Sequence, residues 1–180
     1  MFLILKTIWI LLPSYTPNNF AVVFGGGKPI DFGKNFLDGK RLLGDGKTFR
    51  GFIFGVLGGI FIANLQYLIE IVANVKIYSV LNYTSFVLFA STLAVGSLLG
   101  DMFGSFIKRR LNIERGKPVP LLDQLDFLVF SLGLALLIFP DYFKSIFTTS
   151  IIIIAFVITP ILHFLTNFIA YKLGLKEVPW

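Results

Sequence analysis

Residues 100–126 read GDMFGSFIKRRLNIERGKPVPLLDQLD, a polar segment that separates two long apolar runs of the chain. Asp101 lies within the last turns of the first run, and Asp123 and Asp126 lie at the start of the second. Ionisable side chains at membrane depth are costly and usually mark a functional site. Carboxylates suit a hard divalent cation, and clustered basic residues suit phosphate. This segment therefore predicts phosphoryl chemistry at a membrane surface.

The composition of the whole chain predicts an all-α polytopic membrane protein. Of its 180 residues, 56% are hydrophobic and only 14% are charged, which is more apolar than a soluble domain of this size requires. The chain has no cysteine, which excludes disulfides, thiolate metal sites and a cysteine nucleophile. Its net charge of +6 does not indicate nucleic-acid binding, because the basic residues adjoin apolar runs. Anionic membrane lipids are the nearer partners there.

Five apolar stretches are each near the roughly 20 residues that a helix needs to cross a bilayer. A signal peptide begins with a positively charged region, for which Lys6 alone is a weak match, and Pro13 and Pro17 interrupt the first stretch. We therefore interpret this stretch as a kinked span rather than a signal peptide. Residues 1–180 are expected to form a single integral membrane domain. The expected spans are Met1–Phe24, Gly51–Val75, Phe86–Ile107, Leu122–Phe143 and Phe147–Tyr171.

Basic residues concentrate in two of the four connections and predict the orientation of the chain. By the positive-inside rule these loops, at about residues 25–50 and 108–121, face the cytoplasm, with the N-terminus outside and the C-terminus cytoplasmic. The rule does not explain why most acidic residues gather in the same region, so we expect an active site on the cytoplasmic side of the cell membrane. The basic residues are Lys28, Lys34, Lys40, Arg41, Lys47 and Arg50 in the first of these loops, and Lys108, Arg109, Arg110, Arg115 and Lys117 in the second.

The first of these loops is rich in glycine, which lets backbone N–H groups approach an anion closely. Gly46-Lys47-Thr48 is similar to the end of a P-loop, but that motif's earlier glycine would fall at Arg41 and no strand precedes it. A flexible solvated loop is the alternative. Because that alternative does not explain the interspersed aspartates, we favour a structured loop that closes over a phosphate, with Asp45, Gly46, Lys47, Thr48 and Arg50 near it.

The third apolar stretch carries two superimposed patterns. Gly96, Gly100 and Gly104 recur every fourth residue, a packing feature that could serve an internal contact or a homodimer. Asp101, Ser105 and Lys108 share a second face, on which Asp101 would reach a metal and Lys108 a phosphate. An intrahelical Asp101–Lys108 pair is the alternative. Arg109 and Arg110 project elsewhere and either touch substrate or mark the membrane boundary.

Asp123 and Asp126 follow Pro118 and Pro120, which end the preceding helix and place both acids in the first turns of the next. Acids there also complement the helix dipole, which is the alternative interpretation. Their spacing of three residues puts both carboxylates on one face, as ligation of Mg²⁺ would require. His163, beside Thr159 and Asn167 on the last apolar run, is interpreted as a packing residue rather than a base.

Together these residues resemble the signature region of membrane CTP:phosphatidate cytidylyltransferases. Gln124, where that family has Arg, and the short segment before Leu121 are both similar to the family's archaeal branch, the CDP-archaeol synthases. The resemblance spans essentially the full chain. Its motifs are Gly100-Asp101, Ser105, Lys108-Arg109-Arg110, Gly116-Lys117, Pro120, Leu122 to Asp126, and, in the first loop, Pro29 to Gly33, Asp38 to Arg41 and Leu43 to Gly51.

The resemblance implies transfer of CMP from CTP to an unsaturated archaeal lipid phosphate, 2,3-bis-(geranylgeranyl)glycerol 1-phosphate, with release of pyrophosphate. Asp101, Asp123 and Asp126 would hold Mg²⁺ and, with Lys108, form the catalytic set. Nucleotide and phosphate groups would contact the first-loop residues together with Ser105, Arg109, Arg110 and Lys117. A CDP-alcohol phosphotransferase is disfavoured because its aspartate motif is absent. A transporter of an anionic solute is the alternative function, although no two halves of the chain match.

Overall fold

The computed structural model describes residues 2–78, 81–114 and 116–174, and Met1, Arg115 and the C-terminal end at Trp180 lie outside them. The all-helical prediction is confirmed for the described residues, whose only β-type pairings are two isolated bridges. The six helices are α1 (Phe2–Phe24), α2 (Phe49–Val72), α3 (Tyr83–Arg110), α4 (Leu122–Ile138), α5 (Pro140–Ile146) and α6 (Thr149–Lys172).

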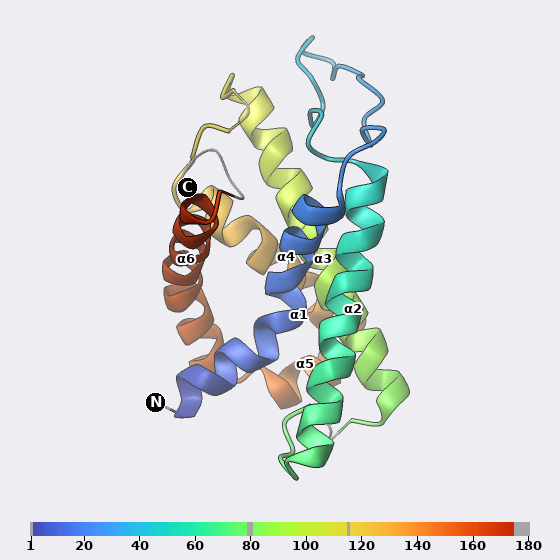
Figure 1. Cartoon of the computed structure of the whole chain (residues 1–180), viewed down its shortest axis with the longest axis vertical. Helices are drawn as coiled ribbons and strands as arrows, with labels where there is room; N and C mark the ends of the chain where they lie inside the picture. Colours follow the sequence, from blue (N-terminus) through green and yellow to red (C-terminus); the bar gives the residue numbers. More distant parts are fainter. Residues whose placement is uncertain (1, 79–80, 115, 175–180) are drawn as a thin grey trace.

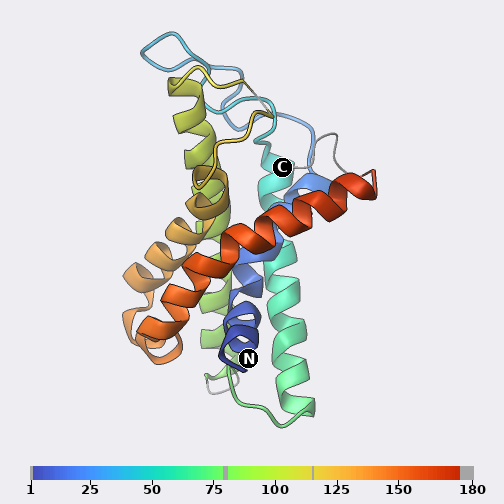
Figure 2. The same ribbon diagram turned by 90° about the vertical axis from the view of Figure 1, so that its left-hand side faces the viewer.

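The helices form a bundle in which α1, α2 and α3 pack together and α4 lies along α3 (Figure 1). The loops at residues 25–48, 111–114 and 116–121 lie at the same end of this bundle, and the described start of α1 lies at the other end. Helix α6 packs against α1 and α4 and crosses the bundle obliquely (Figure 2). Within the described part of the chain, three helices, α2, α3 and α6, contain segments long and apolar enough to cross a membrane.

The fourth apolar stretch, predicted as a span over Leu122–Phe143, is not one continuous helix. Helix α4 ends at Ile138, and Pro140 begins the short helix α5. Proline lacks the N–H that a continuing helix would use, and it keeps the preceding residue out of the helical region, as at Phe139 with φ −129° and ψ 60°. Pro13 and Pro17, in contrast, lie inside α1, which bends but continues (Figure 1).

Glycines allow α2 to pack closely on α1, and α3 to pack closely on α4. A Cβ atom on Gly58 of α2 would lie 2.2 Å from the Phe20 ring of α1. On α3, a Cβ on Gly96 would lie 2.6 Å from Ser131 Cα, and one on Gly100 would lie 2.3 Å from the Asp126 carbonyl oxygen. The glycine stripe of α3 therefore makes an internal contact with α4, because any side chain there would push the two helices apart.

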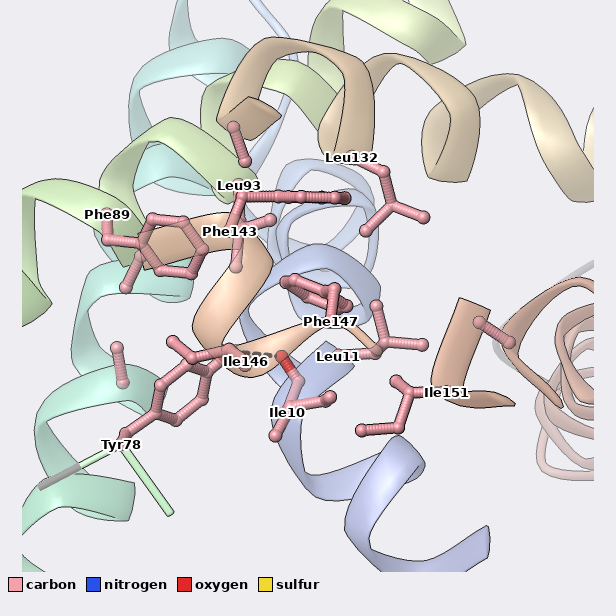
Figure 3. Close-up of a cluster of buried hydrophobic side chains, with 14 of the residues drawn as sticks. Ile10, Leu11, Tyr78, Phe89, Leu93, Leu132, Phe143, Ile146, Phe147 and Ile151 are labelled. Atoms are coloured by element: carbon pink, nitrogen blue, oxygen red, sulfur yellow. Dashed lines mark hydrogen bonds between the residues drawn. The ribbon is translucent and has the colours of Figure 1, made fainter. Parts of the chain in front are cut away.

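The apolar core extends from the end of the bundle away from the two loops as far as Phe127 near the start of α4. Ring contacts link Tyr78, Phe89 and Phe147, and the Tyr78 hydroxyl donates to the carbonyl oxygen of Ile10 (Figure 3). At the same end the buried Glu70 accepts hydrogen bonds from the Trp9 indole and from the backbone N–H of Ile77 and Tyr78. This packing holds the helices together at one end of the bundle, and the two polar loops lie at the other end.

Candidate active site

The first loop is folded around one buried carboxylate, that of Asp31. It accepts hydrogen bonds from Arg41 at 2.9 Å (Nε) and 3.1 Å (Nη2), and from the backbone N–H groups of Leu43, Gly44 and Gly33 at 3.0, 2.9 and 3.1 Å. Burial raises the pKa of Asp31, but these hydrogen bonds outweigh burial and hold the pKa well below its usual range. The ionised carboxylate therefore fixes the path of the loop at Leu43 and Gly44.

Arg110, the last residue of α3, connects the folded loop to this helix through several contacts. Its guanidinium forms an ion pair with Asp38 at 2.9 Å and donates to the carbonyl oxygens of Lys40 and Arg41. The rings of Phe36 and Phe106 flank the guanidinium with centroids 5.0 and 4.8 Å away. These contacts hold the loop over the C-terminal end of α3, so the loop and helix form one rigid wall.

Two lysines connect the loops to the predicted carboxylates. Lys47, from the first loop, forms an ion pair with Asp101 of α3. Lys108, in the last turn of α3, lies 2.6 Å from Asp123 Oδ1 and also donates to the carbonyl oxygen of Lys117 at 3.0 Å. Asp101 and Lys108 therefore do not form the intrahelical pair that was the alternative interpretation.

The third carboxylate, Asp126, occupies the space that Gly104 leaves on α3. A Cβ atom on Gly104 would lie 1.9 Å from Asp126 Oδ2, whereas its nearest other neighbours are also Asp126 side-chain atoms. Asp126 interacts electrostatically with Asp101, Asp123 and Lys47. Acidic side chains of α3 and α4 therefore lie close enough for their charges to interact.

The three carboxylates and the two lysines paired with them line one cavity of about 300 Å³ at the loop end of the bundle. It includes most of the residues that the sequence predicts for the site, on both the acidic and the basic side. Five further residues lining it were not among those predictions. The predicted residues are Gly46, Lys47, Asp101, Ser105, Lys108, Arg109, Lys117, Asp123 and Asp126; the additional ones are Leu43, Gly44, Gly116, His163 and Asn167.

Four of the predicted nucleotide-binding residues do not line the cavity. Thr48 is the N-cap of α2 and accepts from the backbone N–H of Gly51 at 3.0 Å. Arg50 stacks on Phe54 with its guanidinium 5.8 Å from the ring centroid, and the exposed Asp45 carboxylate pairs with Arg41 at 2.6 Å. Arg110 holds the loop, as described above. In this conformation their contacts shape the loop and its junction with α2.

The carboxylates supply hard oxygen donors of the kind that magnesium prefers. Among residues 2–78, 81–114 and 116–174, no three His, Cys, Asp or Glu side chains are grouped closely enough to hold a metal as they stand. In this arrangement lysines pair with Asp101 and Asp123. The negative charges of Asp101 and Asp123 also act on the half-buried Asp126. A cation bound among these three aspartates would offset the repulsion between their negative charges. The three carboxylates are therefore chemically suitable ligands for magnesium.

The carboxylate of Asp31 gives a direct test of how the loop is held. Because its pKa is depressed in the folded state, its contribution is complete above its unfolded value of about 4 and is lost as the pH falls through the folded pKa. At pH 7, Asp31→Asn should weaken the loop by about 1.5–3 kcal/mol, the range for hydrogen bonds to a charged group. Hydrogen exchange at Leu43 and Gly44 should accelerate by roughly tenfold or more.

The matched control is Asp45→Asn, which removes an exposed partner of the same arginine and should change exchange by much less. Equal protection of Leu43 and Gly44 in the Asp31 variant and the wild type would show that this carboxylate does not organise the loop.

The chain matches known proteins along its entire length. A family model described as CarS-like, CDP-archaeol synthase, matches residues 1–180. The CDP-archaeol synthase of Archaeoglobus fulgidus is 58% identical, covering 99% of this chain and 98% of the relative, and that of Methanocaldococcus jannaschii is 46% identical over the same shares.

A solved structure has a similar fold. It is described as an intramembrane enzyme for archaeal membrane lipid biosynthesis, is 36% identical, and has a TM-score of 0.73 over 91% of this chain and 94% of that one. The resemblance found in the sequence motifs is therefore confirmed by full-length matches in sequence and fold. This chain is a membrane protein that belongs to the CDP-archaeol synthase family.

Proposed function

We propose that this chain transfers CMP from CTP to 2,3-bis-(geranylgeranyl)glycerol 1-phosphate, an unsaturated archaeal lipid phosphate, and releases pyrophosphate. Its membership in a cytidylyltransferase family of archaeal lipid synthesis supports this reaction. The observation that carries the proposal is the single cavity in which three carboxylates meet lysines from two loops at one end of a helical bundle. This arrangement suits a highly charged nucleotide and a membrane-bound acceptor.

The reaction needs positioning and charge stabilisation more than it needs a covalent partner. An ionised oxygen of the lipid phosphate attacks the α-phosphorus of CTP and forms the new P–O bond. The bond from the α-phosphorus to the bridging oxygen breaks, and pyrophosphate leaves with the electron pair. No general base is required for an oxygen that is already ionised. Fixed cations beside the phosphates lower the barrier because they require no reorganisation during the step.

The basic residues of the cavity would bind the phosphates. Lys47 and Lys108 are held by carboxylates in the free protein, so their ammonium groups are already fixed at the cavity wall. Arg109 and Lys117 complete the basic surface. Because Gly46 and Gly44 carry no side chains, the first loop can approach the nucleotide closely, while Arg50, Thr48 and Asp45 support the loop or contact the nucleotide from outside the cavity.

Asp101, Asp123 and Asp126 would hold Mg²⁺, which when bound neutralises the triphosphate. Removal of divalent cations with EDTA is expected to abolish product formation, and added Mg²⁺ should restore it. Monovalent salt at equal ionic strength is the control. Full activity of the chelated, metal-free protein would rule out this assignment.

We also infer that the chain crosses the membrane five times, with α1, α2, α3, α4 with α5, and α6 as the crossings. The grouping of the two basic loops at one end supports a cytoplasmic position for the cavity, with the N-terminus outside and the C-terminus inside. Helix α4 has 17 residues and is short for a span, but its extension by α5 provides additional length.

The proposed activity is tested by incubating the purified chain with Mg²⁺, each ribonucleotide in turn, and ether- or ester-lipid phosphates. Mass spectrometry should detect a CDP-lipid and an equal amount of pyrophosphate with CTP. Movement of an anionic solute across liposomes without either product would favour the transporter alternative and refute the transferase.

A further inference from the structure

Helix α6 contributes a polar stripe to an otherwise apolar surface. Thr159, His163 and Asn167 are spaced four residues apart and therefore lie on one face. Thr159 is buried, hydrogen-bonded to the Tyr15 hydroxyl at 2.8 Å. His163 and Asn167 come next along the stripe and line the cavity that holds the three aspartates. The stripe thus points into the site described above.

The position of the histidine is set by packing on both sides. Its ring stacks on that of Phe127, with centroids 6.5 Å apart and an interplanar angle of 28°. Phe127 directly follows Asp126, so the imidazole lies beside the start of α4. Asn167 Nδ2 lies 3.2 Å from His163 Nδ1, which joins the two polar groups. These contacts hold an imidazole and an amide together at the cavity wall.

The apolar residues of α6 next to His163 and Asn167 are exposed on the outside of the bundle. Phe164, Leu165, Phe168 and Ile169 are 40–60% exposed, and only 17% of the apolar window of α6 is buried. Helix α6 lies obliquely across the bundle rather than within it (Figure 2). In a membrane these exposed residues contact lipid, so His163 and Asn167 occupy the part of the cavity wall nearest the acyl or isoprenoid chains.

We propose that His163 and Asn167 bind the glycerol-phosphate headgroup of the acceptor lipid and so form the acceptor side of the site. The inference rests on the proposed function. A neutral imidazole and an amide each offer both a donor and an acceptor, which suits ester, ether and phosphate oxygens. The lysines and the glycine-rich loop occupy the wall next to the aqueous loops, where the triphosphate of CTP fits better.

The proposal predicts a selective kinetic defect. His163→Ala and Asn167→Ala should each raise the KM for the lipid phosphate about tenfold, while the KM for CTP changes less than twofold. His163→Gln, which retains hydrogen-bonding groups, should recover most of the lost affinity. The matched control is Thr166→Ala, an exposed polar residue on the same turn that bonds to its own helix, and it should change neither constant.

Two direct binding measurements keep the test independent of turnover and folding. Calorimetry with CTP and Mg²⁺ should give wild-type affinity for the variants. Binding of a short-chain glycerol-phosphate lipid should weaken about tenfold. A raised KM for CTP with an unchanged KM for lipid, or no change in either, would overturn the proposal. If the wild type binds the lipid through these residues but forms no CDP-lipid, the acceptor site stands and the proposed reaction fails.

Discussion

Asp126→Asn is expected to lower turnover by at least about 100-fold while leaving the helices assembled. Asp126 projects from the first turns of α4 into the cavity, beside Asp101 and Lys47. Replacing its carboxylate with a neutral amide removes a charged oxygen ligand, and losses of preorganised electrostatic groups of this kind cost roughly 10²–10³ in rate. The measurement is the initial rate of pyrophosphate release at saturating CTP and lipid phosphate.

The matched control is Asp141→Asn, an exposed acid in the first turn of α5 and outside the cavity. It should retain wild-type turnover. Asp123→Asn should resemble Asp126→Asn, with the additional loss of the contact to Lys108. Near wild-type rates for both site variants would exclude these aspartates from the chemistry.

Gly104→Ala is the second change expected to have a large effect, and it acts without removing any charged group. Its new methyl would lie 1.9 Å from Asp126 Oδ2, and its three nearest neighbours are all side-chain atoms of Asp126. The carboxylate must therefore move, and none of these nearest atoms belongs to the backbone of α4. We expect about a 100-fold loss of turnover with a nearly unchanged thermal unfolding midpoint, because small displacements of catalytic groups are costly.

Two other glycines separate this effect from helix packing. Gly133→Ala, on α4, meets nothing within 4 Å and should change neither turnover nor stability appreciably. Gly100→Ala meets the α4 backbone at Asp126 and Phe127 and should lower the unfolding midpoint as well as the rate. Wild-type turnover of Gly104→Ala would show that the position of Asp126 is not critical.

The helices were largely predictable because their apolar lengths and proline positions are local signals. The break between α4 and α5 is also encoded locally, by Pro140, but the hydrophobicity of the segment concealed it. The number of membrane crossings was not determined in the same way. It depends on how α4 and α5 together meet the bilayer, which no single segment specifies.

The site was predictable where one helix carries the pattern. The shared face of Asp101, Ser105 and Lys108 follows from helical spacing, and all three residues line the cavity. Their partners were not predictable, because Lys47 approaches from a loop whose path is set by Asp31 and Arg110. Such long-range contacts depend on tertiary packing rather than on spacing in the chain.

His163 shows how a local pattern can leave the location of a side chain open. Its four-residue spacing with Thr159 and Asn167 was visible, and a packing role was the simpler interpretation. Thr159 is buried against Tyr15 of α1, whereas His163 and Asn167 line the cavity. The direction in which a polar helix face points depends on the helix crossing, which the sequence of that helix does not determine.

The central claim is that Asp101, Asp123 and Asp126 act together on one cation bound with CTP. Electron paramagnetic resonance of Mn²⁺, which accepts the same oxygen ligands as Mg²⁺, measures this directly in the purified chain. With CTP present we predict one tight Mn²⁺ site, weakened at least about tenfold by each of the three Asp→Asn changes. Mn²⁺ affinity unaffected by all three substitutions would contradict the account.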